Sequence, residues 1–241
     1  MNRVLLGMLT PSSNTRLEPL LSAMVASVPN VTVHFSRFPV TEIALDTNVL
    51  AQFDNSKILD AAMLLAHAKV DVIAWNGTSG GWLGFDADER LCRRITEATG
   101  IPATTSTLAL NEALRLTGAK RMALVTPYLD DVQARVIGTY RNAGFDCIAE
   151  RHLKLRDNFS FSEVTGALLD SMVAEVAAAR PQAISTFCTN LNAAHLVPEW
   201  ERRHGIPVYD TVSTALWQSL RIAGVQPSVV KGWGRLFDEV H

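Results

Sequence analysis

The chain has 241 residues, of which 48% are hydrophobic and 19% charged, and its net charge is −2. This balance is typical of a soluble globular protein with an ample core, and it gives no reason to expect nucleic acid or an anionic membrane as a partner. The apolar run from Val4 to Leu9 is far shorter than the roughly 20 residues that span a bilayer. Three widely spaced cysteines without a CxxC pair argue against a disulfide framework or a zinc site. We therefore expect a reduced, cytoplasmic protein.

Short runs rich in β-branched residues alternate with longer stretches at helical spacing, which is typical of a parallel α/β sheet. The expected strands are, in chain order, Arg3–Leu9, Val31–Arg37, Val70–Trp75, Ala103–Thr105, Arg121–Val125, Asp146–Glu150, Ala183–Phe187 and Val208–Tyr209. The expected helices are Thr15–Ser27, Lys57–His67, Ala87–Thr99, Ser106–Leu116, Leu129–Ala143, Ser162–Ala179, Pro198–His204 and Asp210–Ile222. Asp86 is the expected N-cap of the third helix, and Gly118, Gly144 and Gly224 are expected to end helices.

The sequence also reads as two copies of one pattern. Three blocks of the first half return in the same order, at offsets of 116, 111 and 105 residues: Arg3–Pro11 as Arg121–Pro127, Trp75–Ser79 as Thr186–Asn190, and Gly100–Pro102 as Gly205–Pro207. In this overlay Cys188 stands where the first copy has Gly77. A cysteine placed at 77 by substitution is therefore expected to face Cys188.

The repeat predicts two pseudo-symmetric, Rossmann-like α/β lobes, residues 1–117 and 118–241, with part of the last helices crossing over. Ligands of open α/β sheets bind beyond the carboxyl ends of the strands. Four loops are therefore expected to surround one active site at the lobe interface: Thr10–Asn14, Asn76–Gly81, Thr126–Tyr128 and Cys188–Asn190.

Cys188 is the candidate catalytic residue, because it follows a predicted buried strand and precedes Thr189 and Asn190. Neighbouring amides are expected to lower its thiol pKa from the reference of about 8.5 and to favour a nucleophile or a proton carrier. The alternative is an inert core cysteine, since free cysteines are often buried. Cys92, in a predicted helix, and Cys147, in an edge-like strand, are interpreted as structural.

Three further segments carry polar groups that suit a carboxylate. Thr78 and Ser79 offer hydroxyls and amides in a glycine-rich loop, which either binds an oxyanion or is an ordinary turn. Ser12 and Asn14 lie where a helix opens, so they either cap that helix or hold an anion. Tyr128 either donates its hydroxyl to the same space or packs half-buried. No GxGxxG, P-loop or HExxH motif supports a nucleotide or metal mechanism, and the six histidines form no ligand pattern.

Four of these blocks, Pro11–Thr15, Gly77–Ser79, Val125–Tyr128 and Cys188–Asn190, resemble the aspartate/glutamate racemase superfamily. Within it they resemble the branch that holds arylmalonate decarboxylase, maleate cis–trans isomerase and a related ectoine-utilisation protein. The resemblance covers essentially the whole chain. It implies a cofactor-free active site between two pseudo-symmetric lobes, with a small carboxylate as substrate.

Racemases and maleate isomerases of this superfamily carry one cysteine in each lobe, whereas this chain has Gly77 in the first. A single second-lobe cysteine is similar to arylmalonate decarboxylase. By that similarity, Thr78, Ser79 and Tyr128, with amides near Ser12 and Thr189, hold a carboxylate that becomes an enediolate as carbon dioxide leaves. Cys188 then protonates the intermediate from one face.

The chain also departs from the decarboxylase pattern. Ser12-Ser13-Asn14 replaces an apolar, proline-rich segment, and Asn14 matches an isomerase asparagine that binds a carboxylate. Asn190 and Asn76 add polar groups, which favours a more polar substrate than an arylmalonate. An apolar wall formed by Phe38, Pro39, Val40 and Ile43 is an alternative to simple core packing for that segment.

Three functions follow as hypotheses. The first is a cofactor-independent decarboxylase of a substituted malonate or similar small dicarboxylate, with Cys188 as proton donor. The second is a racemase or a cis–trans isomerase of a small carboxylate such as maleate, with a non-cysteine partner for Cys188. The third is a carboxylate-binding relic without catalysis. The oligomeric state stays open.

Overall fold

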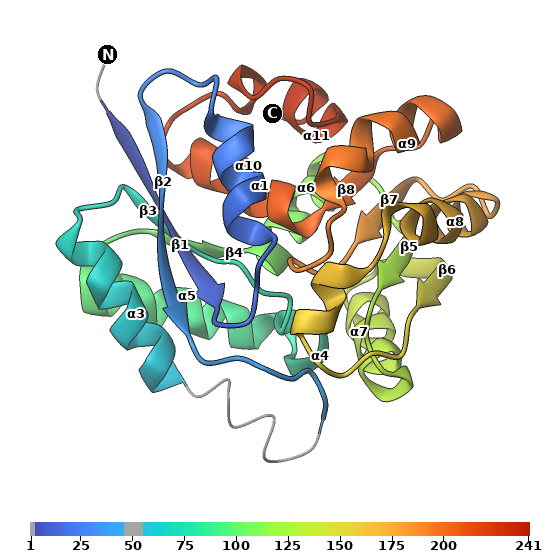
Figure 1. Cartoon of the computed structure of the whole chain (residues 1–241), viewed down its shortest axis with the longest axis horizontal. Helices are drawn as coiled ribbons and strands as arrows, with labels where there is room; N and C mark the ends of the chain where they lie inside the picture. Colours follow the sequence, from blue (N-terminus) through green and yellow to red (C-terminus); the bar gives the residue numbers. More distant parts are fainter. Residues whose placement is uncertain (1–2, 46–54) are drawn as a thin grey trace.

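A computed structural model describes residues 3–45 and 55–241. It contains two four-stranded parallel sheets of identical topology, β2-β1-β3-β4 and β6-β5-β7-β8 (Figure 1). The strand order of the second sheet is that of the first with four added to each strand number. The repeat seen in the sequence is therefore also a repeat of the fold. The predicted pair of pseudo-symmetric α/β lobes is confirmed; the boundary at 117/118 stays a prediction.

The eight strands fall at the predicted places: β1 Val4–Pro11, β2 Val31–Phe38, β3 Val72–Trp75, β4 Ala103–Thr105, β5 Arg121–Thr126, β6 Asp146–His152, β7 Ala183–Thr186 and β8 Val208–Asp210. The α-helices are α1 Leu17–Val25, α3 Asn55–His67, α4 Gly80–Leu83, α5 Phe85–Thr99, α6 Ser106–Leu116, α7 Asp130–Asn142, α8 Gly166–Ala177, α9 Val197–His204, α10 Thr211–Ile222 and α11 Arg235–Glu239. Three 3₁₀ turns complete the described elements: η2 Phe159–Glu163, η3 Ala194–Leu196 and η4 Pro227–Val229. Within the described residues, no helix has both the length and the apolar character needed to cross a bilayer.

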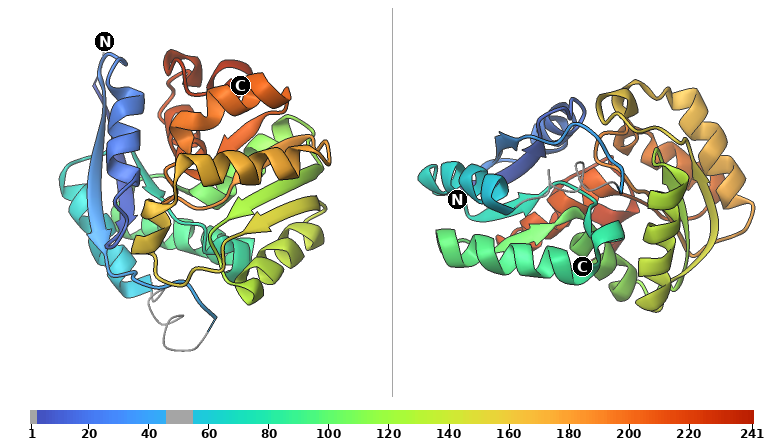
Figure 2. Two further views of the ribbon diagram at one scale, coloured as in Figure 1. Left: turned by 45° about the vertical axis from the view of Figure 1, so that its right-hand side comes forward. Right: turned by 90° about the horizontal axis from the view of Figure 1, so that it is seen from below.

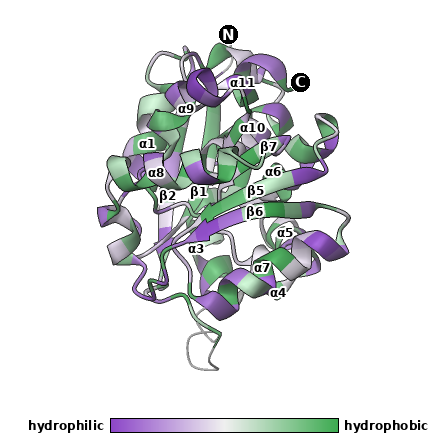
Figure 3. Ribbon diagram, turned by 90° about the vertical axis from the view of Figure 1, so that its right-hand side faces the viewer, coloured by the Kyte–Doolittle hydropathy of each residue, from purple (hydrophilic) through white to green (hydrophobic). Residues whose placement is uncertain are grey.

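The inner strands form the core of each lobe. Every residue of β3 and β7 is buried, as expected for parallel strands that are covered on both faces. The edge strand β6 is only half-buried and partly hydrophilic, as its colouring in Figure 3 shows. Central strands of this kind end in the interior, so the residues that follow them enter a dry environment.

Helices cover both faces of the sheets (Figure 2). In the first lobe α3 and α5 pack together beside the sheet, and α1 packs on β2. The helix α10, which follows the last strand of the second sheet, packs against α6 and β3 of the first, where Thr214 Oγ1 donates to the Ser106 carbonyl at 3.0 Å. The two lobes therefore share one interior.

The predicted helix ends are mostly confirmed. Gly118, Gly144 and Gly224 all have positive φ, and the repeated Gly-Ile-Pro blocks place Gly100 and Gly205 in the left-handed region at the ends of α5 and α9.

Two predictions of helix starts are wrong. Gly84, not Asp86, precedes the first residue of α5; Asp86 lies in the first turn and pairs with Arg90. The predicted helix 162–179 begins only at Gly166, because Thr165 caps it by accepting from the Leu168 amide at 3.3 Å. The short helices α4 and α11 were not predicted.

Candidate active site

A small pocket with about 20 Å³ of free space lies between the lobes, at the carboxyl ends of the central strands. Four chain segments that are far apart in the sequence meet there, as the topology rule predicts. The pocket is lined by Pro11, Val40, Ile43, Trp75, Gly77, Thr78, Ser79, Trp82, Tyr128, Asn158, Cys188 and Thr189. This free space is little more than one buried water needs.

The structure brings together most of the predicted site residues. Gly77, Thr78, Ser79, Tyr128, Cys188 and Thr189 all line this pocket. Val40 and Ile43 supply part of the expected apolar wall, whereas Phe38 packs behind it on Trp75, with ring centroids 4.9 Å apart. No charged side chain of the described residues belongs to the lining, so a bound carboxylate would be held by neutral donors.

Two hydrogen bonds orient the hydroxyls. Thr78 Oγ1 and Tyr128 Oη are 2.5 Å apart, and Trp75 Nε1 donates to Ser79 Oγ at 3.3 Å. Because the indole already occupies an acceptor position of Ser79, the Ser79 hydroxyl proton is left to point elsewhere. Burial and the Cys188 charge raise the pKa of Tyr128 well above its usual value, so its phenol stays a donor.

Cys188 is 3% exposed, and the expectation of a lowered thiol pKa is wrong. Burial raises the pKa of the Cys188 thiol to about 12. The Asn190 amide, whose nitrogen is 3.4 Å from Sγ, and the Tyr128 hydroxyl favour the thiolate, but the cost of desolvating a charge is larger. At neutral pH this thiol is protonated, so it suits proton donation better than nucleophilic attack.

Each lobe buries an aspartic acid behind its site loop. Thr105 Oγ1 donates to Asp88 Oδ2 at 2.6 Å, and Thr186 Oγ1 donates to Asp210 Oδ2 at 2.7 Å. Burial raises the pKa of Asp88 to about 7 and the pKa of Asp210 to about 6. The charge of Asp210 also raises the pKa of Cys188. These acids were not among the predicted site residues, since nothing in the sequence marks them as buried.

The structure gives Asn14 a tethering role. Its Oδ1 accepts from the amides of Arg16 and Leu17, at 3.0 and 2.9 Å, and so caps α1, which confirms the capping alternative. Its Nδ2 donates to the carbonyl and the hydroxyl of Thr189 in the other lobe, at 3.1 and 3.2 Å. Its predicted contact with a substrate carboxylate stays a prediction.

Asn190 mirrors this arrangement from the second lobe. Its Oδ1 accepts from the Thr15 amide at 3.0 Å, and its Nδ2 donates to the Asn158 carbonyl at 2.6 Å. Ser12 lies just outside the pocket lining, where its Oγ accepts from the Val40 amide at 3.1 Å. The predicted contacts of Asn190 and Ser12 with substrate also stay predictions.

A short antiparallel contact spans the lobes beside the pocket. Glu42 and Asp157 form an isolated bridge, and the Asn158 amide donates to the Thr41 carbonyl at 2.9 Å. Asn158 Nδ2 also donates to Ser13 Oγ at 2.7 Å. Sequence reasoning missed Asn158, because its segment has no strand or helix pattern.

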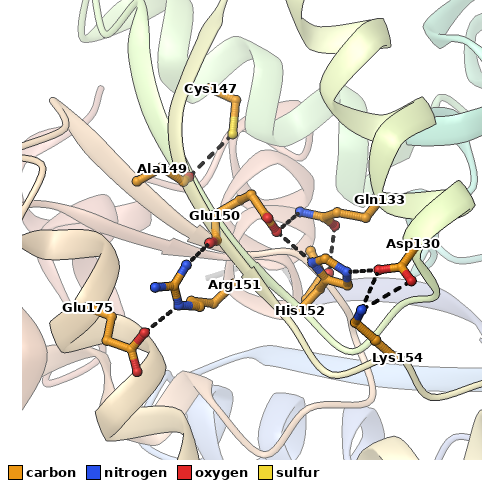
Figure 4. Close-up of polar contacts among 10 residues, drawn as sticks. Asp130, Gln133, Cys147, Ala149, Glu150, Arg151, His152, Lys154 and Glu175 are labelled. Carbon is orange, nitrogen blue, oxygen red and sulfur yellow. Dashed lines mark hydrogen bonds and ion pairs between the residues drawn. The ribbon is translucent and has the colours of Figure 1, made fainter.

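The loop that carries Tyr128 is anchored by a polar network on the edge strand (Figure 4). Thr126 Oγ1 donates to Gln133 Oε1, whose Nε2 donates to Glu150 Oε2, at 2.7 and 2.9 Å. His152 lies between Glu150 and Asp130, with each ring nitrogen 2.7 Å from a carboxylate oxygen. Burial alone would lower the pKa of His152, but the hydrogen bonds to the two carboxylates raise it overall.

The Trp75 ring lies over Gly77. A Cβ built on Gly77 would be 2.0, 2.3 and 2.7 Å from Cζ2, Cε2 and Cη2 of that indole. A cysteine at 77 would therefore require the Trp75 ring to move, and the expectation that its thiol faces Cys188 stays a prediction. Trp75 and Trp82 line the pocket but were missed, since tryptophans at a strand end and in a loop are also typical of ordinary core packing.

None of the described residues form a group of three His, Cys, Asp or Glu side chains able to hold a metal ion. A family model described as arylmalonate decarboxylase matches residues 20–237. The chain belongs to the arylmalonate decarboxylase family. The family's place in the Asp/Glu racemase-like superfamily agrees with the resemblance seen in the sequence, and family membership makes the chain an enzyme.

Individual relatives of this arylmalonate decarboxylase family member carry two different activities. It is 31% identical to arylmalonate decarboxylase of Bordetella bronchiseptica over 185 residues, covering 76% of this chain and 77% of that one. It is 26% identical to a maleate isomerase of Pseudomonas putida, covering 96% of each chain. The crystal structure of the maleate isomerase Iso from Pseudomonas putida S16 superposes with a TM-score of 0.91 at 25% identity over the whole of both chains.

Proposed function

We propose that the protein is a cofactor-independent decarboxylase of a substituted malonate or a similar small dicarboxylate. The observation that carries this proposal is the pocket itself, which has one thiol, four hydroxyls on Thr78, Ser79, Tyr128 and Thr189, and no charged side chain among the described residues. Such a site offers neutral hydrogen-bond donors to one carboxylate and a protonated acid to a carbon atom.

In the proposed reaction the bond between the α-carbon and one carboxylate breaks. Carbon dioxide leaves, and the electron pair stays on the α-carbon and the remaining carboxylate as an enediolate. The hydroxyls of Thr78, Ser79 and Tyr128 stabilise the charge that develops on the two oxygens, which is the task of preorganised donors in a dry site. The walls of Pro11, Val40 and Ile43 face the leaving carboxylate with apolar groups.

Cys188 then gives its S–H proton to the α-carbon. A thiol with a pKa near 12 is still a far stronger acid than the α-carbon of a carboxylate, so the transfer is downhill. The same high pKa means that the resulting thiolate recovers a proton readily from water, which closes the cycle.

A second candidate is the cis–trans isomerisation of a small dicarboxylate such as maleate. The likeness over the whole of both chains to the Pseudomonas maleate isomerase favours it. This reaction needs a nucleophile that adds to the double bond, and Cys188 is the only thiol in the pocket lining of the described residues. Its raised pKa opposes that role, so decarboxylation is the first choice.

Proton NMR in D₂O tests both candidates, with methylmalonate, phenylmalonate, maleate and a chiral 2-arylpropionate as substrates. Loss of carbon dioxide with one deuterium at the α-carbon supports the decarboxylase. Conversion of maleate to fumarate overturns it in favour of the isomerase. Turnover of none of the four by a folded protein would count against both.

A further inference from the structure

The last residues of β3 and β7 hold equivalent positions in the two sheets, but only one of them has its side chain in the pocket lining. Trp75 and Thr186 are the last residues of β3 and β7, each two positions before the pocket residue Gly77 or Cys188. The Thr186 hydroxyl is bound to Asp210 and does not line the pocket, whereas the Trp75 indole does.

Trp75 is fixed in this position by its neighbours. It is 1% exposed, its ring packs on Phe38, and its Nε1 donates to Ser79 Oγ. Three ring atoms lie within 2.7 Å of the point where residue 77 would place a Cβ. Only glycine fits beneath the ring, so the indole occupies the volume that a first-lobe side chain at 77 would fill.

Trp75 and the second-lobe thiol of Cys188 line the same pocket. The segments after β3 and β7 face each other directly, since Thr189 Oγ1 donates to the Asn76 carbonyl at 3.0 Å. The only polar hydrogen of the indole is already given to Ser79. The ring itself therefore presents an apolar surface with no proton to transfer.

We propose that Trp75 is the specificity-determining residue of this enzyme: its indole fills the volume of a side chain at position 77 and limits the α-substituent to a few carbon atoms. That the limited group is an α-substituent rests on the proposed decarboxylation. The limit on size rests on the packing of Trp75 and holds for any carboxylate bound in the pocket.

Binding of unreactive monocarboxylates tests the size limit without any turnover. NMR titrations with propionate, isobutyrate, phenylacetate and 2-phenylpropionate would be run on the wild type, Trp75→Leu and a control, Trp217→Leu. Trp217 is a buried indole of α10 that donates to the Val240 carbonyl at 2.9 Å and does not line the pocket. Trp217→Leu therefore removes a buried indole, as Trp75→Leu does, but leaves the pocket lining unchanged.

We expect Trp75→Leu to bind the two phenyl acids at least tenfold more tightly than the wild type does, with a smaller change in affinity for propionate. Trp217→Leu should keep the wild-type order of affinities for the four acids. Equal size selectivity in the wild type and Trp75→Leu would overturn the inference. If selectivity widens but no malonate is decarboxylated, the size limit stands and the proposed function fails. Decarboxylation of phenylmalonate by the wild type at the rate of methylmalonate would support the function and overturn the size limit.

A thermal double-mutant cycle tests the shared volume. Gly77→Cys is expected to lower Tm strongly in the wild type and much less in a Trp75→Leu background, because the ring has gone. Additive losses of Tm would show that the indole does not occupy the site of the missing side chain. The cycle uses only unfolding, so it stays informative even where a variant is inactive.

Discussion

The ends of β3 and β7 hold equivalent places in two sheets of the same topology, yet they supply opposite kinds of group to one pocket. The second lobe supplies a buried thiol, Cys188, and turns Thr186 away to a carboxylic acid. The first lobe supplies an indole from Trp75 and reduces the facing position to Gly77. A duplicated fold fixes where two groups meet, but the packing of one side chain decides whether both of these positions can carry a thiol.

The largest expected effect comes from the thiol. Cys188→Ser should lower the kcat for decarboxylation by about 10²–10⁴, because a hydroxyl is a much weaker acid and general acid catalysis contributes factors of that size. Cys147→Ser is the matched control: Cys147 is half-buried in the edge strand, where its Sγ donates to the Ala149 carbonyl, and it does not line the pocket, so activity should be unchanged. A Cys188→Ser enzyme within threefold of the wild type would remove Cys188 from its proposed role.

The second prediction compares the protonation state of Cys188 with that of a free cysteine. With its pKa near 12, thiolate at pH 8 is roughly three orders of magnitude scarcer than in a free cysteine. Alkylation by iodoacetamide, followed by mass spectrometry of the peptide with Cys188, should be slow and should accelerate about tenfold per pH unit between pH 7 and 9. A rate that levels off below pH 8 would instead reveal a nucleophilic thiolate and favour the isomerase.

The buried acids of the two lobes are expected to affect stability over different pH ranges. Because the pKa of Asp88 is raised in the folded state, its neutral form stabilises the fold fully below about pH 3.8, and that contribution is lost as pH rises to about 7. The stabilising contribution of neutral Asp210 is lost in the same way as pH rises to about 6. The free energy of unfolding of the wild type, measured in urea, should fall by about 1 kcal/mol between pH 6 and 7 as Asp88 ionises. Asp88→Asn should lack this fall, whereas Asp210→Asn should keep it. Identical slopes in both variants would show that the two acids titrate alike.

The smallest expected effect concerns the network on β6. The pKa of His152 is raised in the folded state, so its contribution to stability is complete below about pH 6.5 and is lost as pH rises through the folded pKa. His152→Gln should lower the free energy of unfolding by about 0.5–1 kcal/mol at pH 6 and by less at pH 9. A difference that does not change with pH would assign His152 a packing role only.

Much of this arrangement was predictable from the sequence. Alternating strands and helices, the repeated blocks and the rule for parallel sheets suffice to bring Thr78, Tyr128 and Cys188 to one space. What failed were properties that depend on the surroundings of a side chain. The amides near Cys188 were anticipated, but its depth of burial, which dominates its pKa, follows only from the packing of both lobes.

The missed residues have the same explanation. Trp75 belongs to a buried strand, so its sequence context does not tell whether the ring packs in the core or turns toward a ligand. Asn14 and Asn190 have side chains that suit an anion, yet each finds partners across the interface, where a buried amide is costly to leave unpaired. Only the docked lobes decide between those uses.

The packing of α10 makes the two lobes depend on each other. This helix follows the last strand of the second sheet but covers α6 and β3 of the first, so a fragment ending at Thr117 would lack part of its own interior. Cutting the chain between the sheets should therefore expose apolar surface on both pieces, and neither half is expected to fold as a separate domain.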